Sequence, residues 1–217
     1  MKKLFTITII GLLSTGAFAQ TSQGTKVVSG SMRISTDSDN SMHQGYSSQN
    51  YSSLYLYFSP SFGYLFKENL EAGLSVGYTY NESESTQDRD LSDDYNSANK
   101  SNTYGFSPYL KKYFTISEKV ALSTKFSAGL SFGRSNYEST NAYPATSEYK
   151  SKGISANFIP GITFFPSEKF GISASFGDLG YHYTTSENEN NGYKSTSKDF
   201  ELDLSSSTFG IGFSYHF

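Results

Sequence analysis

The chain has 217 residues, a formal charge of −3 and no cysteine, and it contains 18 tyrosines and 18 phenylalanines. The acidic balance argues against a nucleic-acid partner, and the absence of cysteine excludes disulfides, thiolate metal sites and thiol nucleophiles. The length fits one large domain or at most two small ones, and the content of aromatic residues, glycine and serine favours strands and turns over helices.

The N-terminal residues have the pattern of a secretory signal peptide. Two lysines precede an apolar stretch from Leu4 to Leu13, and residues 17–19 form the small-residue pattern that signal peptidase cleaves. The apolar stretch is shorter than the roughly 20 residues that a membrane-spanning helix needs. We therefore expect residues 1–19 to be removed, with cleavage between Ala19 and Gln20, and residues 20–217 to form one mature domain.

Eight segments of the mature chain alternate between large apolar residues and small or polar ones, which is the period of a strand with two different faces. In chain order they lie at residues 28–34, 54–66, 70–80, 104–110, 120–132, 154–164, 170–183 and 200–217. In the seventh segment the apolar positions change parity between Phe176 and Leu179, so we expect a β-bulge near Gly177 and Asp178. We expect a second slip in the eighth segment.

The connections between these segments have two lengths. Short polar turns surround Glu68, Glu118 and Glu168, which are 50 residues apart, whereas the other four connections are long and polar. This spacing predicts the repeated hairpins of an up-and-down meander. Four long connections and three short ones place both chain ends on the side of the short turns, which requires an even number of strands.

The second face of the segments distinguishes a soluble sheet from a membrane barrel. A soluble sheet would carry charged residues there, but this face consists mainly of Ser, Gly, Thr, Asn and Tyr, and residues 52–64, 154–165 and 207–217 contain no charged side chain. Small polar residues fit the narrow lumen of an eight-stranded barrel, and the apolar face then meets lipid. We predict an all-β fold: an eight-stranded antiparallel up-and-down transmembrane β-barrel with short periplasmic turns and long extracellular loops.

The last segment keeps its alternation to the final residue, which indicates that it pairs with the first strand and closes the barrel. The terminal GIGFSYHF, the hairpin SPSFGYLFKENLEAGLSVGY and the stretch FGDLGYHY resemble the small outer-membrane β-barrel proteins of Gram-negative bacteria, of the OmpX/OmpA-like kind. The resemblance covers essentially all of the mature chain and implies a location in the outer membrane. It also implies that Phe213, Tyr215 and Phe217 form the signal that the barrel assembly machinery reads. Because the chain ends on the barrel, we do not expect the peptidoglycan-binding domain of longer relatives.

Inward positions hold nearly all the charges of the strands. If the odd-numbered residues of the third to fifth segments face inward, the lumen contains Glu71, Lys111 and Lys125, with Tyr109 and Tyr113 as bulk, and the first segment adds Arg33. Charges in a narrow lumen are costly unless they are paired. We therefore predict a lumen charge network that helps to plug the barrel, in which Glu71 pairs with Lys111 and Lys125 lies one step higher.

Three other patterns could carry chemistry, and each has a simpler interpretation. The G-x-S-x-G motif occurs at residues 73–77 and 129–133, but a nucleophile elbow needs a strand-to-helix turn and both matches are expected in mid-strand. His182 lies near the outer end of its segment without a well-placed serine, and His216 is expected to be structural. The aspartates of residues 88–94 lack the calcium-loop spacing, which favours a solvated loop. We predict no catalytic site, no metal and no cofactor.

The favoured function is a non-enzymatic surface scaffold whose polar loops serve adhesion, defence or envelope integrity. A small pore for ions or solutes is the alternative, although an aqueous channel needs more strands, and an outer-membrane lipid-modifying enzyme is the second alternative. Expected partners are outer-membrane lipid, the barrel assembly machinery and a candidate extracellular ligand of the loops, with no nucleic acid, and we expect a monomer. The pattern leaves open the loop ligand, the conductance of the lumen, the oligomeric state and cation binding by loop 81–102.

Overall fold

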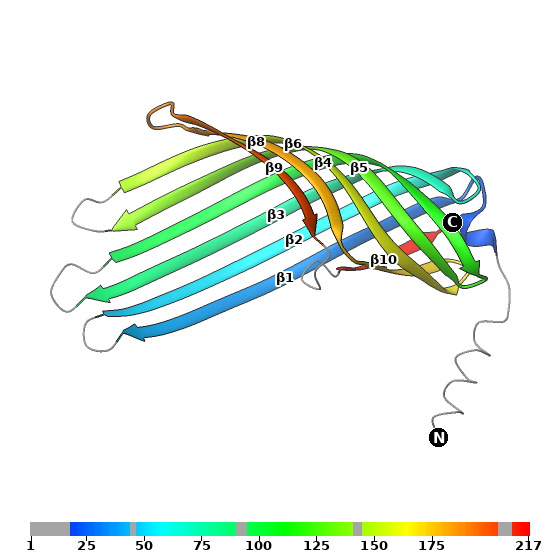
Figure 1. Ribbon diagram of the computed structural model, residues 1–217, viewed down its shortest axis with the longest axis horizontal. Helices are drawn as coiled ribbons and strands as arrows, with labels where there is room; N and C mark the ends of the chain where they lie inside the picture. Colours follow the sequence, from blue (N-terminus) through cyan, green and yellow to red (C-terminus); the bar gives the residue numbers. More distant parts are fainter. Residues whose placement is uncertain (1–17, 44–46, 90–94, 141–144, 204–209) are drawn as a thin grey trace, which may run out of the picture.

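The computed structural model describes residues 18–43, 47–89, 95–140, 145–203 and 210–217 (Figure 1). A short 3-10 turn, η1 (Phe18–Thr21), precedes the strands. In chain order the strands are β1 (Lys26–His43), β2 (Ser47–Lys67), β3 (Leu70–Arg89), β4 (Tyr95–Ser117), β5 (Val120–Thr140), β6 (Ala145–Ser167), β7 (Phe170–Ser175), β8 (Asp178–Asn188), β9 (Lys194–Asp203) and β10 (Gly210–His216). Within these residues, no helix is long and apolar enough to cross a membrane.

The strands form a closed antiparallel ring. Neighbours from β1 to β6 pair in chain order, β6 pairs with both β7 and β8, and β10 pairs with both β7 and β1. The consecutive pieces β7 and β8 fill the seventh position of the ring, and β9 and β10 belong to the eighth. The predicted eight-stranded up-and-down topology is therefore confirmed, and it leaves η1 and the C-terminal residue near the short turns (Figure 1).

Both predicted slips are present. Phe158 and Gly161 are three residues apart on β6, whereas their ladder partners Leu179 and Ser175 are four residues apart. The seventh position of the ring therefore holds one extra residue. Gly177 lies in this bulge with φ of 76°, a conformation that glycine adopts without strain. In the eighth position of the ring, Asp203 and Gly210 are seven residues apart, whereas their ladder partners Asp178 and Ser175 are only three residues apart. The ladder therefore shifts by four residues, over a stretch that lies outside the described residues.

The last strand closes the ring against the first. The ladder runs from Val27 opposite His216 to Gly30 opposite Phe213, and Lys26 and Phe217 exchange two backbone hydrogen bonds of 2.8 and 2.9 Å. The prediction from the terminal alternation is confirmed. In the described part of the chain, residues 31–43 of β1 pair with β2 alone and β9 pairs with β8 alone.

The connections differ from the prediction at one end of the barrel. At the end that holds η1 and the C-terminal residue, two-residue turns join β2 to β3, β4 to β5 and β6 to β7, as predicted. At the other end, the hairpin end, loop 81–102 is mostly paired strand, because the β3–β4 ladder continues from Asn81 opposite Ser101 to Gln87 opposite Tyr95. Because these polar residues are hydrogen-bonded to the neighbouring strand, they keep regular strand geometry. Glu82 and Lys100 also form an ion pair of 2.7 Å across the two strands.

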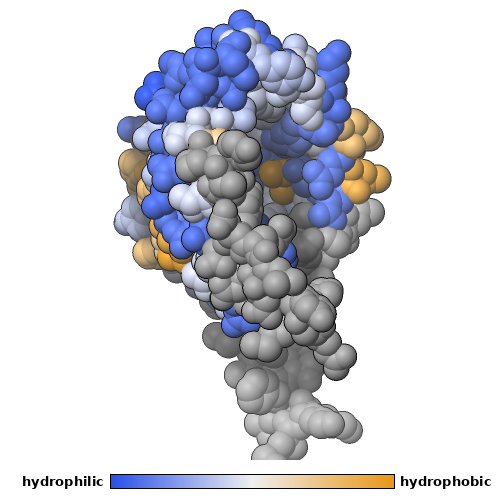
Figure 2. Space-filling model, turned by 90° about the vertical axis from the view of Figure 1, so that its left-hand side faces the viewer, coloured by the Kyte–Doolittle hydropathy of each residue, from blue (hydrophilic) through white to orange (hydrophobic). Residues whose placement is uncertain are grey.

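The two faces of the ring have opposite character, as predicted. Outward phenylalanines are about half exposed, for example Phe58 at 50% and Phe126 at 51%, whereas inward Ser123 is 6% exposed. On β5 the mostly apolar outward residues from Leu122 to Phe132 extend over ten residue steps, which is about 33 Å of strand and about 25 Å of height at a tilt of about 40°. That height matches the apolar band of an outer-membrane barrel. Figure 2 shows hydrophilic residues around the hairpin end and hydrophobic residues on the sides.

Candidate functional site

Five inward side chains from five strands fill the lumen next to the short turns. They are 3% exposed or less, and we call them the plug: Val27, Leu65, Tyr113, Phe165 and His216. The Phe165 ring lies 6.3 Å from the Tyr113 ring and meets the His216 ring edge-on at 5.5 Å. The sequence reasoning missed Val27, Leu65 and Phe165, although the signal was available: each is an apolar residue at an inward position beside a turn or a chain end.

The segment before β1 seals the plug from below. Gln20 and Thr21 are 4% and 6% exposed, and the Thr21 carbonyl accepts a hydrogen bond of 2.8 Å from the Asn69 amide. The Gln20 carbonyl lies 2.8 Å from Nδ1 of His216, and because a carbonyl only accepts, Nδ1 carries the proton. Nε2 then accepts from the Ser214 hydroxyl at 3.0 Å. His216 thus ties the last strand to the N-terminal segment, a structural role that agrees with the expectation.

Glu71 is buried beside the plug and bound by two tyrosines. Its side chain is 1% exposed, and its two carboxylate oxygens accept hydrogen bonds from Tyr109 Oη at 2.5 Å and from Tyr113 Oη at 2.6 Å. Glycine makes room for this group, because a Cβ at Gly63 would collide with the Glu71 carboxylate and one at Gly73 with the Tyr109 ring. Charge-assisted hydrogen bonds of this kind compensate a buried carboxylate.

Two of the predicted lumen cations lie in register with Glu71. Lys111 is the ladder partner of both Glu71 and Lys125, so the three residues lie in one register across β3, β4 and β5. The height of Lys125 relative to Lys111 stays a prediction. The Lys111 ammonium sits 4.6 Å from the centre of the Tyr113 ring and the Lys125 ammonium 4.3 Å from that of Tyr109, which are cation–π distances. No ion pair involves Glu71 in the described residues, so its pairing with Lys111 stays a prediction.

Arg33 does not lie in register with Glu71, Lys111 and Lys125. It is exposed and its ladder partner on β2 is Tyr57, whereas Glu71 lies opposite Leu65, eight residues away along β2. Arg33 therefore occupies an inward position much nearer to the hairpin end.

A polar cavity of about 280 Å³ lies above Lys125. Serine, threonine and glycine make most of its wall. Lys125 is the one charged side chain among the described residues that line it, and it has a hydrogen bond of 3.2 Å to Ser75 Oγ. Hydroxyls and one ammonium can bind water or a small polar solute. Both G-x-S-x-G segments lie inside strands, β3 and β5, and not at a strand-to-helix turn, so this context does not activate their serines.

The other candidate chemical groups are not assembled in the described residues. His182 lies opposite Ser155 in the β6–β8 ladder, but no hydrogen bond joins the two side chains in the described residues. No set of three or more His, Asp or Glu side chains suited to a metal ion occurs in the parts of the chain that the structure describes. The acidic stretch falls largely on residues 90–94, which lie outside them.

The three residues of the expected assembly signal lie on the outer face of β10 and just beyond it. Phe213, Tyr215 and Phe217 are 65%, 38% and 54% exposed. The Tyr215 ring stacks on Phe217 at 5.9 Å and meets Phe170 of β7 edge-on at 5.2 Å. They form an aromatic surface at the closing strand that a binding partner can reach, and their role as a signal stays a prediction.

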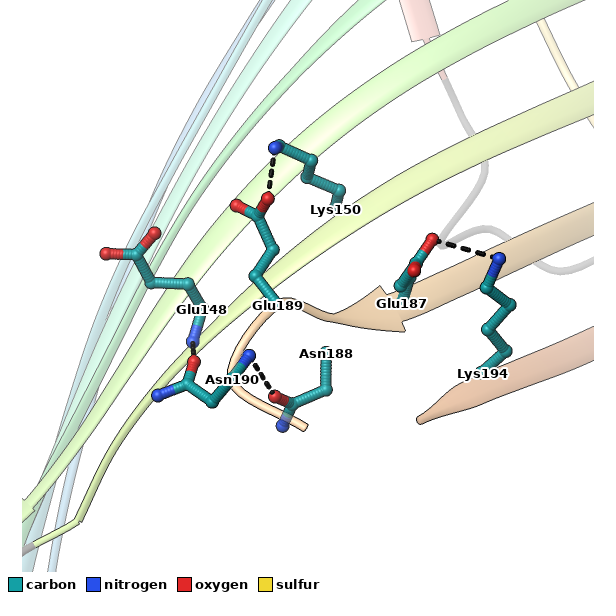
Figure 3. Close-up of polar contacts among 7 residues, drawn as sticks. All are labelled: Glu148, Lys150, Glu187, Asn188, Glu189, Asn190 and Lys194. Atoms are coloured by element: carbon teal, nitrogen blue, oxygen red, sulfur yellow. Dashed lines mark hydrogen bonds and ion pairs between the residues drawn. The ribbon is translucent and has the colours of Figure 1, made fainter. Parts of the chain in front are cut away.

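At the hairpin end, the β8–β9 turn is fixed to β6 (Figure 3). Asn190 accepts a hydrogen bond of 3.1 Å from the Glu148 amide and donates one of 3.0 Å to the Thr146 carbonyl. Lys150 forms an ion pair with Glu189, and Lys194 forms one of 3.3 Å with Glu187. These contacts fix the conformation of the β8–β9 turn relative to β6.

Comparison with known proteins gives a family and a fold. Residues 5–217 match a family model described as the outer membrane protein beta-barrel domain, and no curated protein sequence matches. The similar solved structures include the Neisserial surface protein NspA, with 15% identity over 90% of this chain and 98% of that one and a TM-score of 0.42. OprG from Pseudomonas aeruginosa has 12% identity over 92% and 98%, with a TM-score of 0.47. Ail, the attachment invasion locus protein of Yersinia pestis, has 15% identity over 90% and 99%, with a TM-score of 0.36.

Proposed function

The chain belongs to the outer membrane protein beta-barrel family, and we propose that it is a non-enzymatic surface scaffold with a closed lumen. The family places it in the bacterial outer membrane, and we propose that the short turns lie in the periplasm and the hairpin end outside. The observation that carries the proposal is the plug, whose five side chains come from five strands and are almost fully buried. A solute would have to displace them, and the segment beneath them, to pass.

The outer hairpins support the role of a scaffold. They continue as paired strand beyond the apolar band, and the β8–β9 turn is held on β6 by side-chain contacts. Rigid polar hairpins lose little conformational entropy on binding. We therefore propose that an extracellular ligand engages them, in adhesion, defence or envelope integrity.

The proposal also includes the processing, the assembly and the oligomeric state of the barrel. We propose that residues 1–19 are removed before folding, that the assembly machinery reads Phe213, Tyr215 and Phe217, and that the barrel is a monomer. Because Gln20 and Thr21 lie under the plug, cleavage after Ala19 would leave the sealing segment on the mature domain.

A small pore is the second candidate, and one observation favours it: the cavity above Lys125 reaches from the middle of the lumen towards the hairpin end. It would conduct only if the plug moved.

Single-channel recording separates the two candidates. The refolded mature barrel is reconstituted in planar bilayers, and we expect no stable open state from the wild type. The double variant Tyr113→Ala with Phe165→Ala removes two rings of the plug and should conduct, whereas Phe126→Ala with Phe158→Ala, which removes two rings from the outward face, should not. A steady wild-type conductance that changes with Lys125→Glu would overturn the closed-lumen proposal.

A further inference from the structure

Three basic residues gather on the outward face of two neighbouring strands near the hairpin end. Arg134 of β5 lies directly opposite Lys150 of β6, and Lys152 lies two residues nearer the apolar band, opposite Phe132. All three are exposed, and they share the outward parity of Phe132 and Ile154, which are 53% and 52% exposed. We call Arg134, Lys150 and Lys152 the basic cluster.

The charge of the basic cluster is only partly compensated within the chain. Like charges directly opposite each other on two strands are destabilising. Lys150 has an ion pair with Glu189 (Figure 3), but no ion pair joins Arg134 or Lys152 to a carboxylate of the described residues. Glu187 is engaged with Lys194, and Glu148 lies two residues beyond Lys150, away from the apolar band. Two cations are therefore left for an external anion.

The position of the cluster matches the head groups of the outer leaflet. On β5, Arg134 is the first outward residue after the apolar run from Leu122 to Phe132, and on β6, Lys152 is the last before Ile154. That run spans about 25 Å, the height of the lipid-facing band. Leu130, Phe132 and Ile154 are about half exposed and form an apolar strip directly below the cations.

We propose that the basic cluster, with the apolar strip below it, binds a phosphorylated lipid of the outer leaflet. The phosphate is held by the Arg134 guanidinium, which can donate two parallel hydrogen bonds, and by the Lys152 ammonium. The acyl chains lie along Leu130, Phe132 and Ile154. An acidic polypeptide or free phosphate would use the cations but not the strip. This binding depends on the location in the outer membrane and not on whether the lumen conducts.

The test is a titration of the refolded mature barrel in detergent, followed by native mass spectrometry. The probes are diphosphoryl lipid A, the same lipid without its phosphates, inorganic phosphate and polyglutamate. The double variant Arg134→Gln with Lys152→Gln should weaken diphosphoryl lipid A about tenfold or more, and Arg134→Lys should keep part of the affinity. The matched control is Lys26→Gln with Lys112→Gln, which removes two outward cations at the periplasmic border and should bind like the wild type.

Several results would overturn the proposal. The first is that the Arg134/Lys152 variant binds lipid A with the same affinity as the wild type. The second is that the control variant loses as much lipid A affinity as the Arg134/Lys152 variant, and the third is that the wild type binds the lipid without phosphates as tightly as diphosphoryl lipid A. Binding of inorganic phosphate or polyglutamate as tight as that of lipid A would also overturn it. A heat-dependent gel shift confirms that each variant is folded, and the single variants Arg134→Gln and Lys152→Gln replace the double one if it does not fold.

Discussion

At the scale of the residue, Glu71 shows how this barrel accommodates a charge in its lumen. The carboxylate is almost fully buried, and it accepts hydrogen bonds from two tyrosines while two lysines lie in the same register. A carboxylate can accept both hydrogen bonds, whereas an amide has one acceptor oxygen and an NH₂ group that only donates. The geometry therefore specifies glutamate and not its neutral isostere.

We accordingly expect Glu71→Gln to destabilise the barrel by about 1–3 kcal/mol, because one tyrosine hydroxyl loses its acceptor and Lys111 and Lys125 lose the nearby negative charge. Urea unfolding of the protein in lipid vesicles measures the change. Tyr109→Phe is the control that removes one donor, and its effect should not add fully to that of Glu71→Gln. Equal unfolding midpoints for Glu71→Gln and the wild type would contradict this account.

At the scale of the element, the short strand β10 has two structural roles. Its backbone closes the ring between β1 and β7, and its outward aromatic residues face lipid. A charge on that face has to enter the hydrocarbon, whereas a charge in the outer hairpins stays in water.

We therefore expect Phe213→Asp, and deletion of Phe217, to lower the amount of protein in the outer membrane well below that of Asn96→Asp in the outer part of β4. A basic residue at mid-bilayer costs about 2–4 kcal/mol and an acidic one less. Immunoblots of outer-membrane fractions compare the three variants. Equal membrane levels for the strand and hairpin variants would count against the assignment of β10.

At the scale of the whole molecule, ring closure leaves the barrel with hydrogen-bonded strands on all sides of its periplasmic half. Such a structure resists detergent until it is heated, because no edge is open to local unfolding there.

The mature protein should therefore migrate differently on a gel when it is not boiled, fractionate with outer membranes, and begin at Gln20 by mass spectrometry. The boiled sample is the control. Recovery from the soluble periplasm without a heat-dependent shift would refute the membrane location.

The sequence by itself determined the strands, their outward faces and the closure of the ring. Alternation with period two is a local property, so Phe58, Phe126 and Phe213 could be assigned to the lipid face without any knowledge of their neighbours. The parity change at Gly177 likewise revealed the bulge, because a single extra residue reverses every later side chain.

Only the tertiary structure decided which inward and outward residues meet. Glu71 reaches tyrosines 38 and 42 residues away, and Gln20 meets His216 across 196 residues. The basic cluster exists because the β5–β6 register sets Arg134 opposite Lys150, and the long loops proved to be hairpins because the β3–β4 ladder continues to Gln87. Periodicity states which way a side chain points but not its height relative to other strands, since the stagger of a closed barrel is a property of all its strands together.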